Sequence, residues 1–465
     1  MTIKVTNTSI QKIKDSDRFE PRYHHIFNKF DEYEKFSKFQ ILRFGDKKII
    51  QKITDGEHAG QTFVEKGVRF LKNSAVKDFS INLHDGFFIT EHKHKQQKRS
   101  ALKPLDILFT TVGHLGSTAI VPENFGEANI NQNVVKIEID KNFIDPYYLT
   151  AYLNGNTTKK QIGALFTGNI HSIITYPKIK NIRIIIPKDT FQKQVAKKYK
   201  CAIGLDQRCH LIIEKAQSIF YQQIGIDFSK IKQEKTFSVN LSYFKVNNLW
   251  NPAFSYPLYV NTLNAIQKKW QTIPLGEMAT VKKGDEVGSE NYVKYLDKKD
   301  SDIPFVRTSD LVNYEVDQFP DFYIPEEIHQ ELGQDIKVGD VLFTKDGKVG
   351  MSAMITKNDN AIIASGMVRL RLKAEAKKYN LTPEYLFIVL SLKETGLYPA
   401  IRRTVIASTI PHLREERLKE FEIPVLDKNS IDEITKLVKE AFELKDEKKK
   451  LIKEVREEID KYFDI

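Results

Sequence analysis

KPLDILFTTVGHLGSTAI, at residues 103–120, and KVGDVLFTKDGKVGMSAM, at residues 337–354, are two versions of one pattern and decide how the chain is organised. Asp340 follows Asp106 by 234 residues, and the same separation relates further identical residues. These pairs are Leu108 and Leu342, Phe109 and Phe343, Thr110 and Thr344, Gly113 and Gly347, and Gly116 and Gly350. Matches in such strict register indicate an internal repeat, which has to be recognised before single elements are assigned.

The correspondence continues outward from these stretches with small changes in separation. Matching segments are Phe19–Tyr23 and Trp250–Phe254, Phe70–Leu71 and Phe305–Val306, Asp145–Leu149 and Thr382–Leu386, and Pro187 and Pro424. Each copy is then about 190 residues long, a usual size for one domain. We predict a first domain at residues 1–188 and a second domain at residues 229–426.

Each copy is followed by a segment with the apolar spacing of one long helix. Residues 189–228 and residues 427–465 carry apolar side chains at helical intervals without an internal proline. In the second segment, charges of both signs separate the apolar positions, as in a solvated two-stranded coiled coil. The first segment is its natural partner. Lys445 and Lys448 fall near the expected seam, so we expect looser pairing or a third element there.

Shorter patterns within the copies predict the fold class. β-Branched or alternating runs predict strands at residues 134–139, 182–187, 340–344 and 367–372. Patterns opened by proline predict short helices at residues 146–153 and 383–390. The fold class is therefore predicted to be α+β. Both glycine loops should lie between two strands, where glycine permits the positive φ of a tight hairpin.

Composition narrows the classes of function. The chain has 465 residues, of which 41% are hydrophobic and 29% charged, enough for more than one packed core. Lys and Arg number 72 against 61 Asp and Glu, and the formal charge of +11 favours a polyanionic partner such as nucleic acid. There is no apolar run long enough to cross a bilayer, and the N-terminal residues are charged where a signal peptide is apolar. We expect a cytoplasmic protein without a membrane partner.

One short motif is similar to a catalytic motif. Asn251-Pro252-Ala253-Phe254 resembles the segment with which amino-methyltransferases hold a flipped adenine, but Ala253 stands where that motif usually has proline. A strand followed by a glycine-rich turn for S-adenosylmethionine is also missing from the sequence pattern. Because the first copy has Glu20-Pro21-Arg22-Tyr23 in the same position, we interpret the motif as the beginning of a domain.

Metal and phosphate sites are also poorly supported. Asp321, Asp335 and Lys337 superficially match a nuclease pattern, but the first copy has Gly86, Ala101 and Lys103 there. The histidines His84, His92 and His94 lack cysteine companions or a counterpart in the second copy, and HKHKQQKR at residues 92–99 is more simply a basic loop or strand edge. Neither glycine loop is followed by Lys-Ser or Lys-Thr.

Cys201 and Cys209, eight residues apart, do not suit a disulfide framework. We predict no catalytic residue and no metal site.

The duplicated order of these motifs resembles the specificity subunit of type I restriction-modification systems. The resemblance covers nearly the whole chain: the paired D(I/V)LFT segments with their glycines, the (D/T)P.YL segments, and the proline followed by a long helix. It departs at VLDKNSID after Pro424, where the glutamine common at the start of the family's helix is absent.

This resemblance implies a non-catalytic DNA-recognition subunit. In such proteins each module reads one half of an interrupted DNA target, and the two long helices form an antiparallel coiled coil that separates the readers. Two methyltransferase subunits dock on the chain and methylate adenine, and restriction motor-nuclease subunits complete the assembly. No cofactor is expected on this chain itself. S-Adenosylmethionine, ATP and Mg²⁺ are expected in the partner subunits. Because the two modules differ outside their shared scaffold, the DNA target should be asymmetric.

Basic residues in or near the predicted loops are the candidates for DNA contact. They are Lys93, Lys95, Lys98 and Arg99 before the first paired strand, His114 in the first glycine loop, Lys345 and Lys348 near the second, and Arg402 and Arg403 in an otherwise uncharged loop. Most should contact phosphate, while the two arginines could donate two parallel hydrogen bonds to guanine. Each could instead be merely solvated.

Two other classes of function remain open at this point. The chain could be a stand-alone enzyme, either a diverged adenine methyltransferase or a nuclease that uses the motifs above. It could also be an assembly scaffold whose globular modules do not read sequence. The isolated chain would transfer methyl groups or cut DNA in the first case. In the second, exchanging residues 1–188 would leave the methylated sequence unchanged.

Overall fold

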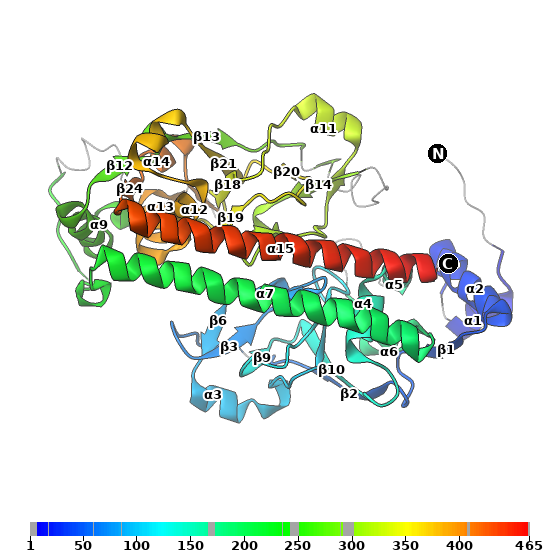
Figure 1. Ribbon diagram of the computed structural model, residues 1–465. Helices are drawn as coiled ribbons and strands as arrows, with labels where there is room; N and C mark the ends of the chain where they lie inside the picture. Colours follow the sequence, from blue (N-terminus) through cyan, green and yellow to red (C-terminus); the bar gives the residue numbers. More distant parts are fainter. Residues whose placement is uncertain are drawn as a thin grey trace. The chain divides into compact units, whose positions relative to one another are not determined.

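The computed structural model describes residues 7–16, 18–58, 60–84, 86–165, 173–234, 236–241, 251–288, 290–291, 302–406 and 410–463. The chain forms two compact units (Figure 1). Unit 1 comprises Met1–Gly204 and Lys448–Ile465, and unit 2 comprises Leu205–Glu447. Trp250, at the start of one repeated segment, lies outside the described residues. Within the described part of the chain, no helix is long and apolar enough to cross a membrane.

In its described residues, unit 1 combines short helices with four small sheets. Its helices are α1 (Ile10–Ser16), α2 (Pro21–Phe36), α3 (Glu91–Gln96), α4 (Pro146–Asn154), α5 (Asn156–Leu165) and α6 (Tyr176–Lys180). Its strands are β1 (Gln40–Arg43), β2 (Ile50–Asp55), β3 (Val68–Leu71), β4 (Val76–Lys77), β5 (Ser80–Ile81), β6 (Phe87–Ile89), β7 (Ile107–Thr110), β8 (Thr118–Ile120), β9 (Ala128–Ile130), β10 (Val134–Ile139) and β11 (Arg183–Ile186).

Unit 2 has a similar mixture of elements. Its helices are α9 (Pro257–Lys269), α10 (Leu275–Met278), α11 (Glu326–Leu332), α12 (Pro383–Ser391), α13 (Tyr398–Arg403) and α14 (Glu415–Lys419). Its strands are β12 (Thr272–Pro274), β13 (Ala279–Lys283), β14 (Ile303–Val306), β15 (Leu311–Val312), β16 (Glu315–Val316), β17 (Tyr323–Ile324), β18 (Val341–Thr344), β19 (Ser352–Met354), β20 (Ile362–Ile363), β21 (Met367–Leu372), β22 (Val405–Ile406), β23 (Pro411–His412) and β24 (Glu422–Pro424).

The main sheets have corresponding strand orders. Unit 1 has the antiparallel order β2-β10-β7-β8, and unit 2 has the antiparallel order β13-β21-β18-β19. A three-stranded sheet accompanies each, β6-β3-β9 in unit 1 and β17-β14-β20 in unit 2, and each contains one parallel pair. The strands predicted from the β-branched runs are confirmed as β10, β11, β18 and β21.

The proline-opened patterns form helices α4 and α12, as predicted. Asp145 caps α4 by accepting from the backbone N–H groups of Tyr147 and Tyr148, and Thr382 caps α12 by accepting from that of Tyr385. Buried Tyr148 donates its hydroxyl to Ile185 O over 2.8 Å, and buried Tyr385 donates to Pro424 O over 2.8 Å. These bonds fasten each helix to the chain that precedes a long helix.

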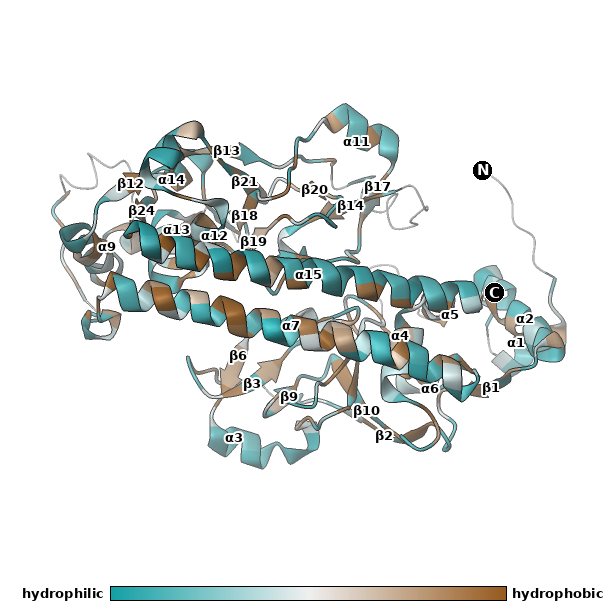
Figure 2. Ribbon diagram, viewed as in Figure 1, coloured by the Kyte–Doolittle hydropathy of each residue, from teal (hydrophilic) through white to brown (hydrophobic). Residues whose placement is uncertain are grey.

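Helix α7 (Asp189–Ile224) and helix α15 (Lys428–Tyr462) each contribute to both units. In unit 1, Gln194 donates to Glu458 over 3.2 Å and Lys198 donates to Glu454 over 3.0 Å. In unit 2, Asp206 lies 3.6 Å from the Lys445 ammonium. Arg208 lies 2.7 Å from Glu440. Because α15 numbers fall as α7 numbers rise, the two helices run antiparallel within each unit. Both carry an apolar stripe between polar positions (Figure 2).

Lys445 lies fully buried in unit 2. Its ammonium is 3.4 Å from Glu315 Oε1 in addition to its contact with Asp206. Burial alone would lower the pKa of Lys445, but the negative charges of Cys209, Glu315 and Asp206 outweigh burial and raise it. Lys448, in unit 1, is also buried. At Lys445, therefore, the predicted seam of the long helices contains a buried lysine that is paired with carboxylates.

Candidate nucleic-acid interface

The first glycine loop joins β7 to β8, as predicted. Gly113 and Gly116 have φ of 81° and 75°, in the left-handed region that favours glycine. Gly116 N donates to Thr110 O over 2.9 Å, and the Thr110 hydroxyl donates to His114 O. A Cβ atom on Gly116 would lie 2.3 Å from Ile162 Cδ1, so an alanine there would force the Ile162 side chain to shift. His114 is half-buried in this hairpin.

The second glycine loop joins β18 to β19 with matching contacts. Gly347 and Gly350 have φ of 68° and 94°. Gly350 N donates to Thr344 O over 3.1 Å, and the Thr344 hydroxyl donates to Lys348 O over 2.5 Å. The two loops are therefore held by the same hydrogen bonds, one in each unit.

A second segment of chain lies against each glycine loop. In unit 1, Ile174 N donates to Thr111 O over 3.1 Å, and a backbone bridge joins Val112 to Ile173. In unit 2, Leu413 N donates to Lys345 O over 2.8 Å. There a backbone bridge joins Asp346 to His412. Each unit thus presents a glycine hairpin beside a flanking segment.

Exposed apolar side chains accompany these flanking segments. Ile173 is 46% exposed, and in unit 2 Ile406 and Ile410 are 67% and 59% exposed. Single exposed apolar side chains are common on protein surfaces, so these three do not by themselves mark a contact with another molecule.

The basic segment at residues 92–99 is mainly helix α3, not the loop or strand edge that we predicted (Figure 2). Thr90 caps the helix by accepting from Lys93 N over 3.2 Å. This cap and Glu91 in the first turn favour a helix where the run of charges suggested a loop. Lys93 is half-buried and Lys95 is exposed on α3, and Lys98 is exposed in the 3-10 turn that follows.

Arg99, in that turn, is anchored to its own unit. Its guanidinium donates to Asp55 and, over 2.8 Å, to Gly56 O. Burial alone would raise the pKa of Asp55, but hydrogen bonds from His58 and Arg99 outweigh burial and lower it. About half of the Arg99 side chain remains exposed. Arg99 therefore has a structural partner, and its outer edge faces solvent.

The candidates in unit 2 divide into exposed and buried residues. Lys348 is exposed at the tip of the glycine loop. Lys345 is buried, and its ammonium lies 3.1 Å from Asp346 Oδ2 and 3.5 Å from Glu415 Oε1. Lys345 thus neutralises acidic groups beneath the loop, whereas the Lys348 side chain is exposed on it.

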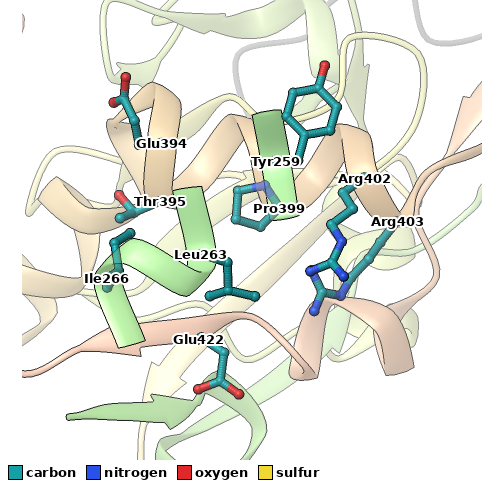
Figure 3. A pocket seen from close by; sticks show the side chains of 9 residues that line it. All are labelled: Tyr259, Leu263, Ile266, Glu394, Thr395, Pro399, Arg402, Arg403 and Glu422. Carbon is teal, nitrogen blue, oxygen red and sulfur yellow. The ribbon is translucent and has the colours of Figure 1, made fainter. Parts of the chain in front are cut away.

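Arg402 and Arg403 lie in the last turn of helix α13, not in the loop that we predicted. Both line a pocket beside α9, together with Tyr259, Glu394 and Glu422 (Figure 3). Each is only 7% exposed. Arg402 donates to Phe254 O over 2.7 Å and its guanidinium lies 4.6 Å from the Phe254 ring centre.

Arg403 is held in a comparable way on the neighbouring position of α13. It donates to Glu420 Oε2 over 3.2 Å, and its burial lowers its pKa. Because these contacts use the guanidinium groups inside unit 2, we interpret both arginines as structural and do not assign guanine recognition to them.

The patterns that were weighed as catalytic have structural roles. Asn251 caps the 3-10 turn Pro252–Ser255 by accepting from Ala253 N over 3.0 Å, and it donates to Thr404 O over 2.5 Å. Its amide therefore ties this turn to the end of α13 within unit 2. Asp321 lies 3.1 Å from the Arg307 guanidinium, and Asp335 lies 2.7 Å from that of Arg371. These arginines satisfy the two carboxylates separately.

The histidines at the start of the basic segment also have protein contacts or lie open to solvent. His94 Nδ1 is 2.6 Å from the Asn129 side-chain oxygen, and His92 is exposed. Within the described residues, no group of three His, Cys, Asp or Glu side chains is arranged to hold a metal ion. Cys201 is exposed and Cys209 buried on α7, and both are free thiols.

Sequence reasoning missed several residues beside the second glycine loop. His412 lies against Asp346, Arg414 is exposed one residue beyond buried Leu413, and the charge of Lys283 acts on Glu415. The first two follow residues 407–409, which lie outside the described residues, and the third lies on β13, so all three are distant from Lys348 in the sequence. In the structure His412 occupies the position that Ile173 occupies in unit 1, because each forms the backbone bridge beside its glycine loop. The sequence repeat would not have identified it, since the match of Pro187 with Pro424 places Ile410 opposite Ile173.

Comparison with known proteins supports the resemblance. The family model described as the type I restriction modification DNA specificity domain matches residues 267–456. The match spans most of unit 2 and extends into the part of α15 that belongs to unit 1. The predicted resemblance to type I specificity subunits is therefore confirmed for this part of the chain. No curated protein matches the chain.

Three solved structures are similar over most of the chain. The S subunit of a type-I restriction-modification system from M. genitalium is 14% identical, with a TM-score of 0.35, over 91% of this chain and 95% of that one. The HsdS subunit from Thermoanaerobacter tengcongensis is 14% identical, with a TM-score of 0.30, over 92% and 97%. A structure described as showing complex assembly and conformational transition of the type I R-M system is 15% identical, with a TM-score of 0.29, over 90% and 97%.

Proposed function

We propose that this chain is the non-catalytic DNA-recognition subunit of a type I restriction-modification complex. It binds an interrupted, asymmetric DNA target and directs partner adenine methyltransferase and restriction subunits to that target. The observation that carries the proposal is the specificity-domain match over residues 267–456, which includes the second glycine hairpin and its flanking segment. The two units are proposed to be diverged copies of one target-recognition domain.

The corresponding contacts in the two units support the proposed duplication. Both main sheets have the same pattern of strand order, and both glycine hairpins are closed by a threonine hydroxyl. The side chains beside the hairpins differ, with Val112 and Ile173 in unit 1 but Asp346 and His412 in unit 2. A shared backbone with different surface chemistry suits two readers of different half-sites.

The surface charges support double-stranded DNA as the partner. Lys95, Lys98 and half-exposed Arg99 in unit 1, and Lys348 in unit 2, present positive charge to solvent. Such residues contact phosphates and fix the register of a protein on the duplex. We propose Lys93 and His114 as further contacts, because both are only half-buried and lie beside these residues or in the first glycine loop.

The long helices support the proposed assembly. Antiparallel packing of α7 on α15 within each unit is consistent with a coiled-coil spacer that sets the distance between half-sites. Two methyltransferase subunits would dock on this chain, and restriction motor-nuclease subunits would join them. S-Adenosylmethionine, ATP and Mg²⁺ would be bound by those partners in the cytoplasm.

The proposal is tested by sequencing modified adenines in DNA from cells that contain the methyltransferase partner, with and without this chain. An interrupted, asymmetric methylated motif should be present only with the chain. An unchanged set of methylated sites would contradict the proposal.

A second assay separates the proposal from the enzymatic alternatives. The purified chain is incubated with DNA and labelled S-adenosylmethionine, and separately with DNA and Mg²⁺. We expect neither methyl transfer nor cleavage until the partner subunits are added. Either activity in the isolated chain would identify an enzyme.

A further inference from the structure

The two units differ in chemistry at one equivalent backbone position. The bridge beside the glycine hairpin joins Val112 to Ile173 in unit 1 and Asp346 to His412 in unit 2. The flanking hydrogen bonds are the same, from Ile174 N to Thr111 O and from Leu413 N to Lys345 O. Since the backbone is shared, only the side chains can make the two surfaces different here.

His412 is anchored on one side and open on the other. Its Nδ1 contacts Asp346 Oδ1, while 42% of its side chain is exposed. No hydrogen bond to Nε2 is present within the described part of unit 2. Asp346 is itself fixed, because its other oxygen lies 3.1 Å from the buried Lys345 ammonium. This chain of contacts holds the ring in one orientation and leaves one nitrogen for an external partner.

The surroundings of His412 suit DNA. Lys348 and Arg414 are exposed on the loop and the segment that meet at His412, and the charge of Lys283 reaches Glu415 nearby. Ile410 and Ile406, which flank the same segment, are exposed apolar side chains. In a DNA groove, a base edge lies between phosphate groups. A polar ring with cations and apolar side chains around it can therefore contact the base edge while the cations contact the phosphates.

We propose that His412 is a specificity-determining residue that hydrogen-bonds through Nε2 to a base edge in the half-site read by unit 2, with Asp346 as its positioning residue. This inference rests on the proposed function and deepens it. An unprotonated Nε2 accepts from the amino group of adenine or cytosine, and a protonated one donates to N7 or O6 of guanine. Ile173, the counterpart in unit 1, offers only apolar contact, such as with a thymine methyl group.

The decisive variant is the double substitution D346V/H412I, which gives unit 2 the side chains that unit 1 carries at the same bridge. Asp346 is one of two carboxylates beside the buried Lys345 ammonium, and Glu415 remains 3.5 Å from it in this variant. The variant should therefore lose some stability but still fold and form the complex, as checked by thermal unfolding and co-purification with the methyltransferase. A second variant, H412N, keeps a polar group that can donate to Asp346 but changes the atom offered to DNA. H329I, on α11 of the same unit, is the control, since His329 also lies beside a carboxylate, 3.6 Å from Glu326.

The readout is the methylated motif in cells that carry the full chain and its partners. We expect both variants to change or relax the preference for one base pair in one half-site. Discrimination against the wrong base pair at that position should fall about 5- to 150-fold, and the other half-site should stay unchanged. H329I should methylate the parental motif. A folded, assembled D346V/H412I protein with the parental motif and discrimination would overturn the inference, and so would weaker methylation of an unaltered motif. A parental chain without any chain-dependent motif would instead overturn the proposed function.

Discussion

Gly347 and Gly350 turn the same hairpin, and they share one physical requirement for glycine but differ in a second. Both have positive φ, which other residues adopt at a cost. Gly350 is also closely packed, since a Cβ atom there would lie 2.7 Å from Leu397 Cδ1, whereas one on Gly347 would meet nothing within 4 Å. The backbone conformation is therefore a requirement at both positions, and lack of space is an additional one at Gly350.

We predict that G347A lowers the free energy of unfolding by about 1–2 kcal/mol, from backbone strain alone. G350A should cost more, because the Leu397 side chain must also shift. Denaturant unfolding of both variants measures the difference. G204A is the control: Gly204 lies within α7 with open space around it, so alanine should leave stability unchanged or raise it by up to about 1 kcal/mol. Equal losses in G347A and G350A would contradict the packing argument.

Lys445 is a second residue whose role depends on burial. Its ammonium lies close to Asp206 and Glu315, so its removal leaves buried negative charge without a countercharge. We predict that K445A lowers the free energy of unfolding by about 3–5 kcal/mol at neutral pH, as for other broken buried pairs. Urea unfolding of the full chain measures this loss.

The pH dependence gives a separate check on Lys445. Its folded pKa is raised above the unfolded value of about 10.4, so its contribution is complete below that pH and is lost as pH rises through the folded pKa. The difference in stability between the parental chain and K445A should stay constant from about pH 7 to pH 9 and narrow above pH 10.4. A difference that already narrowed below pH 9 would contradict a raised pKa.

At the scale of elements, α3 is a short basic helix that sequence patterns assigned to a loop. Its cap at Thr90 fixes the first turn, and Lys93, Lys95 and Lys98 lie on it or directly after it. Arg99 ties the end of this segment to β2 through Asp55.

We predict that K93A/K95A/K98A weakens DNA binding on all sequences and makes it less dependent on salt. The slope is that of the logarithm of the DNA-binding constant against the logarithm of the salt concentration. If all three lysines contact phosphate, this slope should become shallower by about 0.9 for each lysine. Binding of the assembled complex to target and non-target duplexes over a series of salt concentrations gives the slope. K436A/K439A/K450A, which removes three exposed lysines from α15, should leave the slope nearly unchanged. Equal slopes in the parental and α3 variants would exclude α3 from the interface.

At the scale of the whole molecule, two units built on similar sheets suggest two separable readers on one chain. Each unit has its own sheets, its own glycine hairpin and parts of both long helices. Since the units fold around separate cores, the reading surface of one can change without rebuilding the other.

We predict that exchanging residues 1–188 for those of a related specificity subunit changes one half of the methylated motif and preserves the other half. Sequencing of modified adenines measures both halves in one experiment. The reciprocal exchange of residues 229–426 should change the opposite half. If the first exchange left the whole motif intact, the globular modules would be a scaffold that does not read sequence.

The sequence by itself determined the repeat, the strands that it contains, the glycine hairpins and the α+β class. These features depend on local rules: Asp106 to Gly116 repeats as Asp340 to Gly350, β-branched runs favour strands, and positive φ favours glycine. The same rules identified charged residues as candidates for DNA contact.

Only the tertiary structure decided which of those charges are available. Arg402 contacts Phe254, which is distant in the sequence, and Arg403 contacts Glu420, which lies outside the loop that we predicted. Lys345 is covered by Asp346 and Glu415. His412 reaches Asp346 across 66 residues. Burial and long-range pairing depend on how separate segments meet, and a local pattern of residue types does not encode that meeting. For this reason the sequence predicted the framework of the chain, and the fold selected the residues that can face a partner.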